Sequence, residues 1–372
     1  MRKKRIIVVA ILICISGIFY LLAGRLNQCS NPDPPDTIES SPLQTLILQD
    51  GERQWNISLS PDFDEEMLLK ELQKINTQIE QPVKNEKWDF LNQVVIPGEA
   101  GRSVDLDATL KLIKQRISEG SPEPVSLVIE LLEPTKVPDY KNENYSERLA
   151  RYSTYFDPEN EGRTNNIKLA ANMLNDIIVA PQDEFSFNKV VGPTSQEKGF
   201  QNALVIVNQE FVMGLGGGVC QVSTTLYNSA LLSGMEIAYR KNHSLPVGYI
   251  PLGRDAAVYY DSLDFRFRNP YDFPIQIKTE VSENRLSIAI YAPQPIDTSY
   301  RIEVGEARII EPEVKIIPDP TLPKGEEVVA QQGRQGYQVE VYRIKVQNEQ
   351  ELRELVSKDI YPEQPKVVYL GI

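Results

Sequence analysis

Residues Gly214–Tyr227 read GLGGGVCQVSTTLY, where a run of glycines leads directly into a helical pattern. Consecutive glycines let the backbone approach a ligand or another segment closely. The first turn of a helix adds free N–H groups and the positive end of its dipole. Gly216, Gly217 and Gly218 are therefore candidate ligand-binding residues. The segment does not indicate a phosphate-binding loop, because no Lys follows the glycines.

Cys220 lies at the start of this helix. The positive end of a helix dipole lowers the pKa of a thiol and favours the nucleophilic thiolate, and neighbouring N–H groups can stabilise an oxyanion. We therefore interpret Cys220 as a candidate nucleophile for acyl transfer, with its own N–H and that of Gln221 as oxyanion donors. Ser223 and Thr224 are further ligand-binding candidates, and capping of the helix start is their alternative role.

His243 is the only histidine of the chain and follows Cys220 by 23 residues. A strand that returns after the helix can bring this imidazole back beside the helix start, where it could act as the base for Cys220. Asp255 and Asp264 are the two candidates for orienting the imidazole. Arg254 is a further candidate for ligand binding.

A structural interpretation competes with this catalytic one. A lone cysteine under a glycine turn is commonly a small core residue, and a lone histidine is commonly a surface or hydrogen-bonded structural residue. The coincidence of Cys220 and His243 near one glycine-rich helix start favours catalysis. Two functions therefore stay open, a cysteine hydrolase or transpeptidase and a binding domain without turnover.

The composition excludes several classes of protein. With 39 Lys and Arg against 52 Asp and Glu, the net charge of −13 is the opposite of what a nucleic-acid-binding protein needs. One His and three Cys without a CxxC or HExxH motif leave no usual zinc site, and we expect neither a metal nor a cofactor. A length of 372 residues allows several domains.

The N-terminus predicts export. Ile6–Gly24 is an uncharged run of 19 residues, long enough to cross a bilayer as a helix, and four basic residues precede it. We expect residues 1–25 to form a signal anchor whose basic end stays in the cytoplasm, so that the C-terminal body lies outside the cell membrane. A cleaved signal peptide is the alternative.

Proline-rich segments separate the expected parts of the chain. Residues 26–44 predict an extended linker. The prolines at 293–295 mark the end of the central domain, and we expect that domain to fold without the part that follows. Cys14 and Cys29 fall before the folded domains, which leaves Cys220 as the only thiol of the folded body.

The remaining pattern predicts an α+β fold in three domains. Residues 45–140 combine short apolar runs with two helices, the second of which ends at Gly120. Residues 146–295 again mix helices and strands. Residues 300–372 predict a small β domain, in which Tyr337–Val346 alternates like a half-buried antiparallel strand.

The central part resembles the VanW domain over about residues 150–293. The resemblance rests on motifs that share its order and spacing, namely Tyr152–Phe156, Phe185–Asn188, Gly192, Gly199–Phe200, Gly216–Tyr227, His243 and Gly253–Ala256. The C-terminal part, with Gly325, Gly333, Gly336 and Gly371, is similar to a G5 domain, a small β module common on bacterial surface proteins. Residues 45–140, with the motif Gly101–Asp105, resemble a peptidoglycan-binding domain often placed before VanW domains.

The resemblance implies an exported envelope protein of a Gram-positive bacterium, of the kind often labelled vancomycin B-type resistance protein. Its implied partners are peptidoglycan or another wall polymer and, through the N-terminal helix, the cell membrane. It implies no reaction, so the roles of Cys220 and His243 rest on the residues themselves.

We expect a single-pass topology with the C-terminus outside, because basic residues precede the one uncharged span. A protease added to intact cells from which the wall has been stripped should digest the protein. Complete protection of everything beyond residue 45 would contradict this topology.

Overall fold

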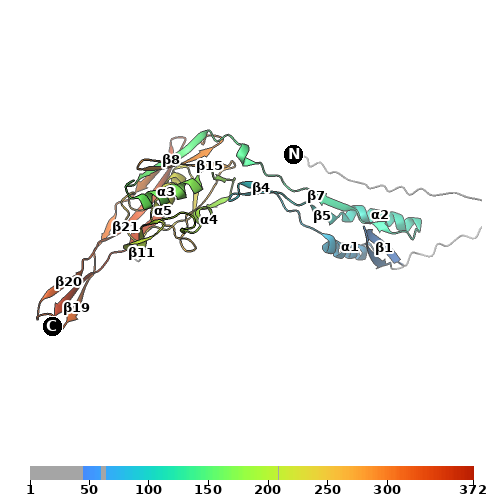
Figure 1. The fold of residues 1–372 in the computed structure, drawn as a ribbon. Helices are drawn as coiled ribbons and strands as arrows, with labels where there is room; N and C mark the ends of the chain where they lie inside the picture. Colours follow the sequence, from blue (N-terminus) through green and yellow to red (C-terminus); the bar gives the residue numbers. More distant parts are fainter. Residues whose placement is uncertain (1–44, 60–63, 208) are drawn as a thin grey trace, which may run out of the picture. The chain divides into compact units, whose positions relative to one another are not determined.

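The computed structural model describes residues 45–59, 64–207 and 209–372, which form two compact units (Figure 1). The first unit comprises the described residues up to Lys87 together with Pro97–Lys136, and the second comprises Trp88–Ile96 and Val137–Ile372. Both units combine helices with small sheets, and strands predominate. The predicted mixed α+β class is therefore confirmed.

The predicted anchor at residues 1–25 and the linker at 26–44 lie outside the described residues. Within the described part of the chain, no helix is long and apolar enough to cross a membrane.

The first unit packs two helices against short strands around one apolar core. α2 begins after Asp105, whose side chain accepts a hydrogen bond from the Ala108 N–H, and it ends at the left-handed Gly120, where the sequence predicts its end. The core is built from Leu68, Leu72, Ile75 and Ile79 of α1, Leu110 and Ile113 of α2, and Leu46 and Leu48 of β1. The elements are β1 (Thr45–Asp50), β2 (Arg53–Ser58), α1 (Glu65–Ile79), β5 (Gly101–Val104), α2 (Leu106–Glu119), β6 (Val125–Ser126) and β7 (Ile129–Leu132).

The hairpin of β3 (Lys87–Asp89) and β4 (Val94–Ile96) belongs largely to the second unit. Trp88 is buried there, edge-on against Tyr140 with 5.3 Å between ring centroids. Its indole N–H donates to the carbonyl of Ile178 at 3.3 Å. The sequence assigns this segment to the N-terminal domain, but the buried indole takes its partners from the second unit.

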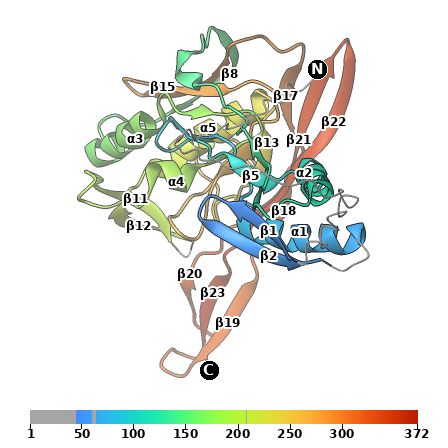
Figure 2. The ribbon, with the colours of Figure 1, turned by 90° about the vertical axis from the view of Figure 1, so that its right-hand side faces the viewer.

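In the second unit, α5 lies in the middle of the central domain (Figure 2). It packs against α3 and against β8 and β16 of the sheet ordered β8-β16-β15-β9. The sheet β10-β14-β13 and the hairpin β11-β12 complete this domain. Its elements are β8 (Glu147–Tyr155), α3 (Glu161–Leu174), β9 (Ile178–Val179), β10 (Glu184–Ser186), α4 (Phe187–Val191), β11 (Asn202–Val207), β12 (Glu210–Leu215), α5 (Val219–Leu232), β13 (Glu236–Tyr239), β14 (Arg266–Arg268), β15 (Ile275–Ser282) and β16 (Arg285–Ala292), preceded by the short 3-10 helix Tyr140–Asn142.

The C-terminal module consists of two small sheets, and β21 covers the strand that the sequence predicts at Tyr337–Val346. The module does not stand apart from the central domain, because Ile302 and Val356 pack against the central core. Central domain and module therefore share one compact unit. The strands are β17 (Ser299–Val304), β18 (Arg308–Ile310), β19 (Val314–Asp319), β20 (Glu327–Gln331), β21 (Gly336–Gln347), β22 (Gln350–Tyr361) and β23 (Lys366–Gly371).

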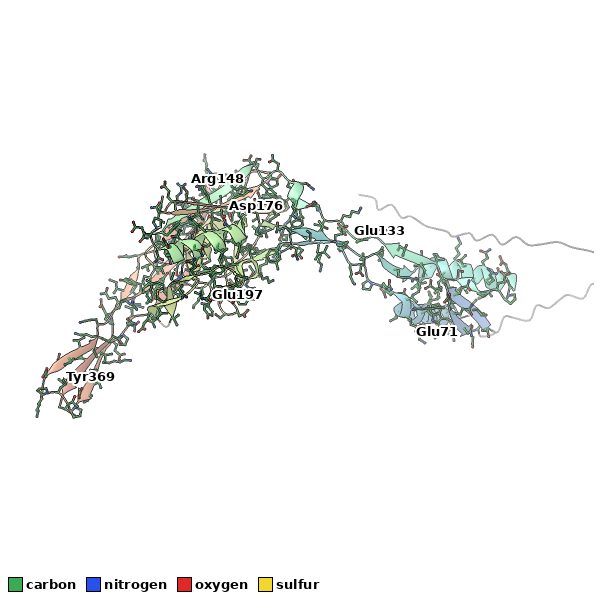
Figure 3. The ribbon with its side chains drawn as sticks, in the orientation of Figure 1. Glu71, Glu133, Arg148, Asp176, Glu197 and Tyr369 are labelled. Carbon is green, nitrogen blue, oxygen red and sulfur yellow. The ribbon has the colours of Figure 1, made fainter. Side chains whose placement is uncertain are left out.

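Acidic side chains lie on the outside of both units (Figure 3). Glu133 is exposed on the first unit, and Asp176 and Glu197 are exposed on the second. Solvent screens the negative charge of such exposed side chains.

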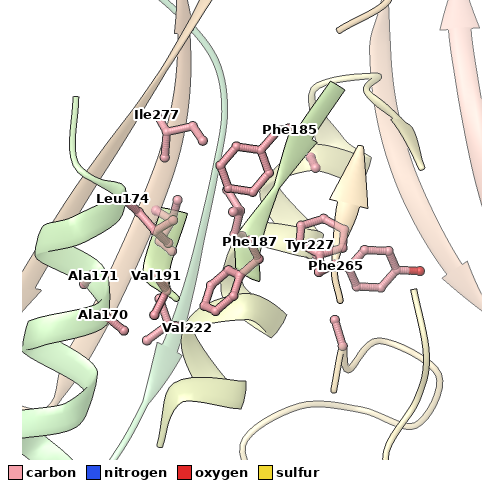
Figure 4. Packing of buried hydrophobic residues seen from close by; sticks show 14 of the residues in the cluster. Ala170, Ala171, Leu174, Phe185, Phe187, Val191, Val222, Tyr227, Phe265 and Ile277 are labelled. Carbon is pink, nitrogen blue, oxygen red and sulfur yellow. The ribbon is translucent and has the colours of Figure 1, made fainter. Parts of the chain in front are cut away.

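The core of the central domain is aromatic on one side of α5 and aliphatic towards α3 (Figure 4). Phe185 stacks on Phe267 with 4.8 Å between ring centroids, and Tyr227 meets Phe265 edge-on. Leu226, one residue earlier on α5, has no exposed surface. Side chains in such surroundings leave a cavity when they are truncated.

Leu226→Ala should therefore lower the free energy of unfolding by about 2–5 kcal/mol. Leu204→Ala is the matched control, because Leu204 is 50% exposed in the same domain and its truncation should change stability by less than about 0.5 kcal/mol. Urea unfolding followed by circular dichroism measures both. Equal losses in the two variants would contradict the assigned core.

Candidate active site

The glycine-rich turn places Cys220 at the first turn of α5. Gly218 is the N-cap residue, with φ at +108°, a conformation that other residues rarely adopt. A side chain at 218 would also lie 3.1 Å from the carbonyl oxygen of Arg163, so the turn can approach α3 only with glycine there. The turn thereby fixes the position of the Cys220 thiol.

Cys220, His243 and Asp255 lie next to one another. The His243 ring interacts with the Cys220 thiol, and its hydrogen-bonding capacity and charge lower the pKa of that thiol. The Nδ1 of that ring lies 2.5 Å from Asp255 Oδ2, which also accepts the backbone N–H of His243 at 2.7 Å. His243 is 7% exposed and Asp255 is 1% exposed, whereas Cys220 is partly exposed. The arrangement is that of a nucleophile, a base and an orienting carboxylate.

The backbone around the sulfur also belongs to this arrangement. The Cys220 thiol can donate to the carbonyl oxygen of Val258 at 3.3 Å, and the Val258 N–H points at the sulfur from 3.5 Å. An N–H directed at sulfur favours the thiolate.

Charge interactions within the chain of three residues favour an ion pair. Burial by itself would raise the pKa of Cys220, but the hydrogen bond and charge of His243 outweigh it and hold that pKa below its ordinary value. Burial would lower the pKa of His243, yet its bonds to Asp255 and Cys220 raise it to about 9. Burial would likewise raise the pKa of Asp255, which His243 and Arg240 keep low. These directions favour the pair of Cys220 thiolate and His243 imidazolium over the neutral pair.

Asp264, the other candidate for orienting the imidazole, has a different role. Its carboxylate accepts hydrogen bonds from the Ser186 hydroxyl at 2.7 Å and from the Asn188 N–H at 2.9 Å, next to the start of α4. Its oxygens are thus used to hold α4, and Asp255 is the partner of His243.

The two predicted oxyanion donors differ. The Gln221 N–H donates to the carbonyl of Gly218 at 3.0 Å, whereas the Cys220 N–H has no acceptor among the described residues. The side chain of Gln221 is buried and bonds Thr154 and Arg163. Of the two amides, that of Cys220 is free to meet a ligand.

Three predicted ligand-binding residues lie away from the surface of the cleft. Ser223 and Thr224 are fully buried, and both bond the backbone of Ala256. The guanidinium of Arg254 donates to Asn228 at 2.7 Å and lies over the Tyr152 ring. These residues hold α5 against the segment that follows His243, because their polar groups are used inside the protein.

The predicted glycines do line a cleft, together with Cys220 and His243. The cleft has a volume of about 1180 Å³. One wall is the hairpin β11-β12, on which Leu204, Phe211 and Met213 expose apolar side chains. Among the described residues that line the cleft, none is Asp or Glu, and Arg163 and Lys241 are cations besides His243.

Sequence reasoning missed several residues of the site. Arg240 bonds Asp255, and Tyr249 lines the cleft beside Cys220. Arg163 reaches the site from α3. Arg240 is only three residues before His243 and could have been suspected. Nothing in the sequence indicates a role for Tyr249 or Arg163. They reach the site only because α3 and the loop that carries Tyr249 pack against α5.

Within the described part of the chain, no group of three or more His, Cys, Asp or Glu side chains is placed to hold a metal ion.

Fold and site together define a modular α+β protein with a cysteine-centred cleft in its middle domain. Comparison with known families identifies the modules. Residues 162–291 match the family described as "VanW like protein", residues 302–372 match "G5 domain", and residues 39–126 match "Putative peptidoglycan binding domain". The chain therefore carries a VanW-like domain between a peptidoglycan-binding domain and a G5 domain.

Two curated proteins are similar to part of the chain. "Uncharacterized protein YoaR" of Bacillus subtilis is 40% identical over 156 residues, which cover 42% of this chain and 52% of the relative. "Vancomycin B-type resistance protein VanW" of Enterococcus faecalis is 26% identical over 168 residues, or 44% of this chain and 61% of the relative. The matches thus span between half and two thirds of each relative.

Two solved structures are similar to the C-terminal module. "IgA1 Protease G5 domain structure" is 33% identical and covers 20% of this chain and 89% of that structure, with a TM-score of 0.18. "HP0197-G5" is 19% identical and covers 20% of this chain and all of that structure, with a TM-score of 0.16.

The ion pair predicts how Cys220 reacts with pH. In a chain carrying Cys14→Ser and Cys29→Ser, alkylation by iodoacetamide should rise with pH through a midpoint below that of a free cysteine, about 8.5, because His243 favours the thiolate. His243→Ala should move the midpoint up by about one unit or more. Rates are measured across about pH 5 to 9. A Cys220 that reacts only after denaturant is added would contradict the ion pair.

Proposed function

We propose that the protein is a cysteine hydrolase or transpeptidase that acts on peptide or amide bonds of peptidoglycan outside the cell membrane. The observation that carries this proposal is the chain from Asp255 through His243 to Cys220, which ends at a partly exposed sulfur in an open cleft. The peptidoglycan-binding and G5 domains indicate a protein associated with the cell wall.

The reaction would follow from the protonation states. The Cys220 thiolate attacks the carbonyl carbon of the amide, and the oxygen that becomes negative is stabilised by the Cys220 N–H. When the C–N bond breaks, the His243 imidazolium gives its proton to the departing amine. Water or a second amine, deprotonated by His243, then attacks the thioester and releases Cys220. Water gives hydrolysis, and an amine gives transpeptidation.

Charge in the cleft supports an anionic substrate. Arg163 donates to the neutral oxygen of Gln221 at 2.7 Å and forms no ion pair with any described residue. Lys241 adds a second positive charge, and no carboxylate is among the described residues that line the cleft. In a chain of net charge −13, this local excess of positive charge would attract a peptide that carries a carboxylate.

Localisation completes the proposal. Residues 1–25 would anchor the protein in the cell membrane of a Gram-positive envelope, and the N-terminal domain would hold wall polymer while the cleft acts on it. The alternative function is a wall-binding scaffold without turnover. The apolar hairpin wall fits this alternative as well, because it could hold a ligand that is never cleaved.

Muropeptide profiles of walls from cells that carry wild-type, Cys220→Ala or His243→Ala protein test the proposal. Both variants should change the profile to that of cells without the protein, because nucleophile and base are each required. Cys29→Ala is the matched control and should leave the profile of the wild type. Purified variants should still bind isolated walls. Unchanged profiles with retained wall binding would favour the scaffold.

A further inference from the structure

We infer that the C-terminal module completes the active site, with Tyr361 of β22 as the residue that positions Asp255. This inference rests on the proposed function. It adds that Tyr361, which lies within the residues matched to the G5 domain, acts in the active site of the VanW-like domain. The VanW match ends at residue 291 and does not include Tyr361.

The end of β22 runs along the segment that carries His243 and Asp255. Successive side chains of a strand point to opposite sides, and Asp359 and Tyr361 share the buried side, at 5% and 1% exposure. Between them, Ile360 is exposed and lines the cleft, and its carbonyl accepts the side-chain N–H of Asn242 at 2.9 Å. Three consecutive residues of the module thus touch the site.

The direction of the Tyr361 hydrogen bond is determined. The Gly253 N–H, which can only donate, points at the Tyr361 hydroxyl from 2.8 Å. The hydroxyl proton is therefore directed to its other neighbour, Asp255 Oδ1. Burial and the nearby Asp255 charge raise the pKa of Tyr361, so the hydroxyl keeps this proton.

Donors from both modules fill the carboxylate of Asp255. Oδ2 accepts the two N–H groups of His243, and Oδ1 accepts Tyr361 and, at 3.2 Å, Arg240. An ionised carboxylate offers about four acceptor positions, so these four donors satisfy it. One of the four comes directly from the C-terminal module.

A second donor depends on the module indirectly. The guanidinium of Arg240 lies between Asp255 and Asp359 and is 5% exposed on its side chain. Asp359 in turn accepts the Ser357 hydroxyl at 2.9 Å. Because Asp359 holds one arm of the guanidinium, the other arm is fixed where it meets Asp255.

The backbone of the central domain packs closely against the C-terminal module at Gly253. Gly253 has φ at +78°, and a side chain there would lie 2.4 Å from a methyl group of Val341 on β21. The turn that leads into Asp255 can therefore rest on the module only with glycine at 253. This contact is not what a loosely tethered module would make.

Without the Tyr361 hydroxyl, Asp255 Oδ1 keeps only the long bond to Arg240, and the Gly253 N–H loses its acceptor. His243 is then held less firmly beside the sulfur, and the ion pair weakens. The pKa of His243 should fall and that of Cys220 should rise, each by about half a unit to one unit. The charged and titratable groups near the site include Arg163, Tyr227, Arg240, Lys241, Tyr249, Arg254, Asp359 and Tyr361.

The test uses the full, untagged chain with Cys14→Ser and Cys29→Ser, with and without Tyr361→Phe. His243 is the only histidine, so one imidazole signal in the NMR spectrum reports its titration directly. Alkylation by iodoacetamide reports Cys220. Tyr361→Phe should move the two midpoints in opposite directions and slow alkylation below the midpoint about 3- to 10-fold. Tyr369→Phe, on β23 (Figure 3), is the matched control and should move neither.

The outcomes separate the two proposals. If the parent chain shows a low Cys220 midpoint and Tyr361→Phe leaves both midpoints in place, or moves them together, the inference is overturned and the proposed function stands. If the parent thiol titrates like a free cysteine, at about 8.5, both are overturned. Thermal unfolding verifies that the variant is folded. If Tyr361→Phe does not fold, the midpoints of His243 and Cys220 are measured in Asp359→Asn instead. This variant loosens Arg240 and should shift both midpoints in the same two directions by smaller amounts.

Discussion

The site depends on the burial of α5, a helix that carries many polar side chains through the core. A buried hydroxyl or amide without a partner costs about 1–3 kcal/mol. The buried Gln, Ser, Thr and Asn side chains of α5 have fixed partners, whereas the Tyr227 hydroxyl has none among the described residues. Ser229 donates to the Ile288 carbonyl on β16, and Thr225 pairs with Thr154 on β8. Ser223 and Asn228 bond the segment 254–256. The helix is thereby held against the sheet and against the turn that carries Asp255, which fixes Cys220 relative to its partners.

A second constraint is the buried charge of Asp255. A carboxylate with 1% exposure is stable only when donors surround it, and the central domain supplies three of the four. The module supplies Tyr361 and, through Asp359, the clamp on Arg240. Electrostatics therefore joins two domains that family comparison separates at residues 291 and 302.

Local signals in the sequence predicted the parts of this structure that local physics determines. The glycine turn and helix start, the pairing of Cys220 with His243, and the end of α2 at Gly120 all follow from turn chemistry, spacing and periodicity. The choice between Asp255 and Asp264 could not be made, since both are acidic residues after His243 and only the packing of α4 claims Asp264. Tyr361 was beyond reach because it lies 106 residues from Asp255, in a module whose prolines at 293–295 suggested independence.

Successive side chains at the end of β22 face opposite sides, and one of them faces the cleft. Asp359 and Tyr361 face inward and hold Arg240 and Asp255, so Ile360 between them must face outward, where it lines the cleft. A ligand in the cleft would then touch the same strand that orients the acid. A ligand that touches Ile360 would therefore lie one residue from Tyr361 and one from Asp359, the two side chains of the module that hold Asp255 and Arg240.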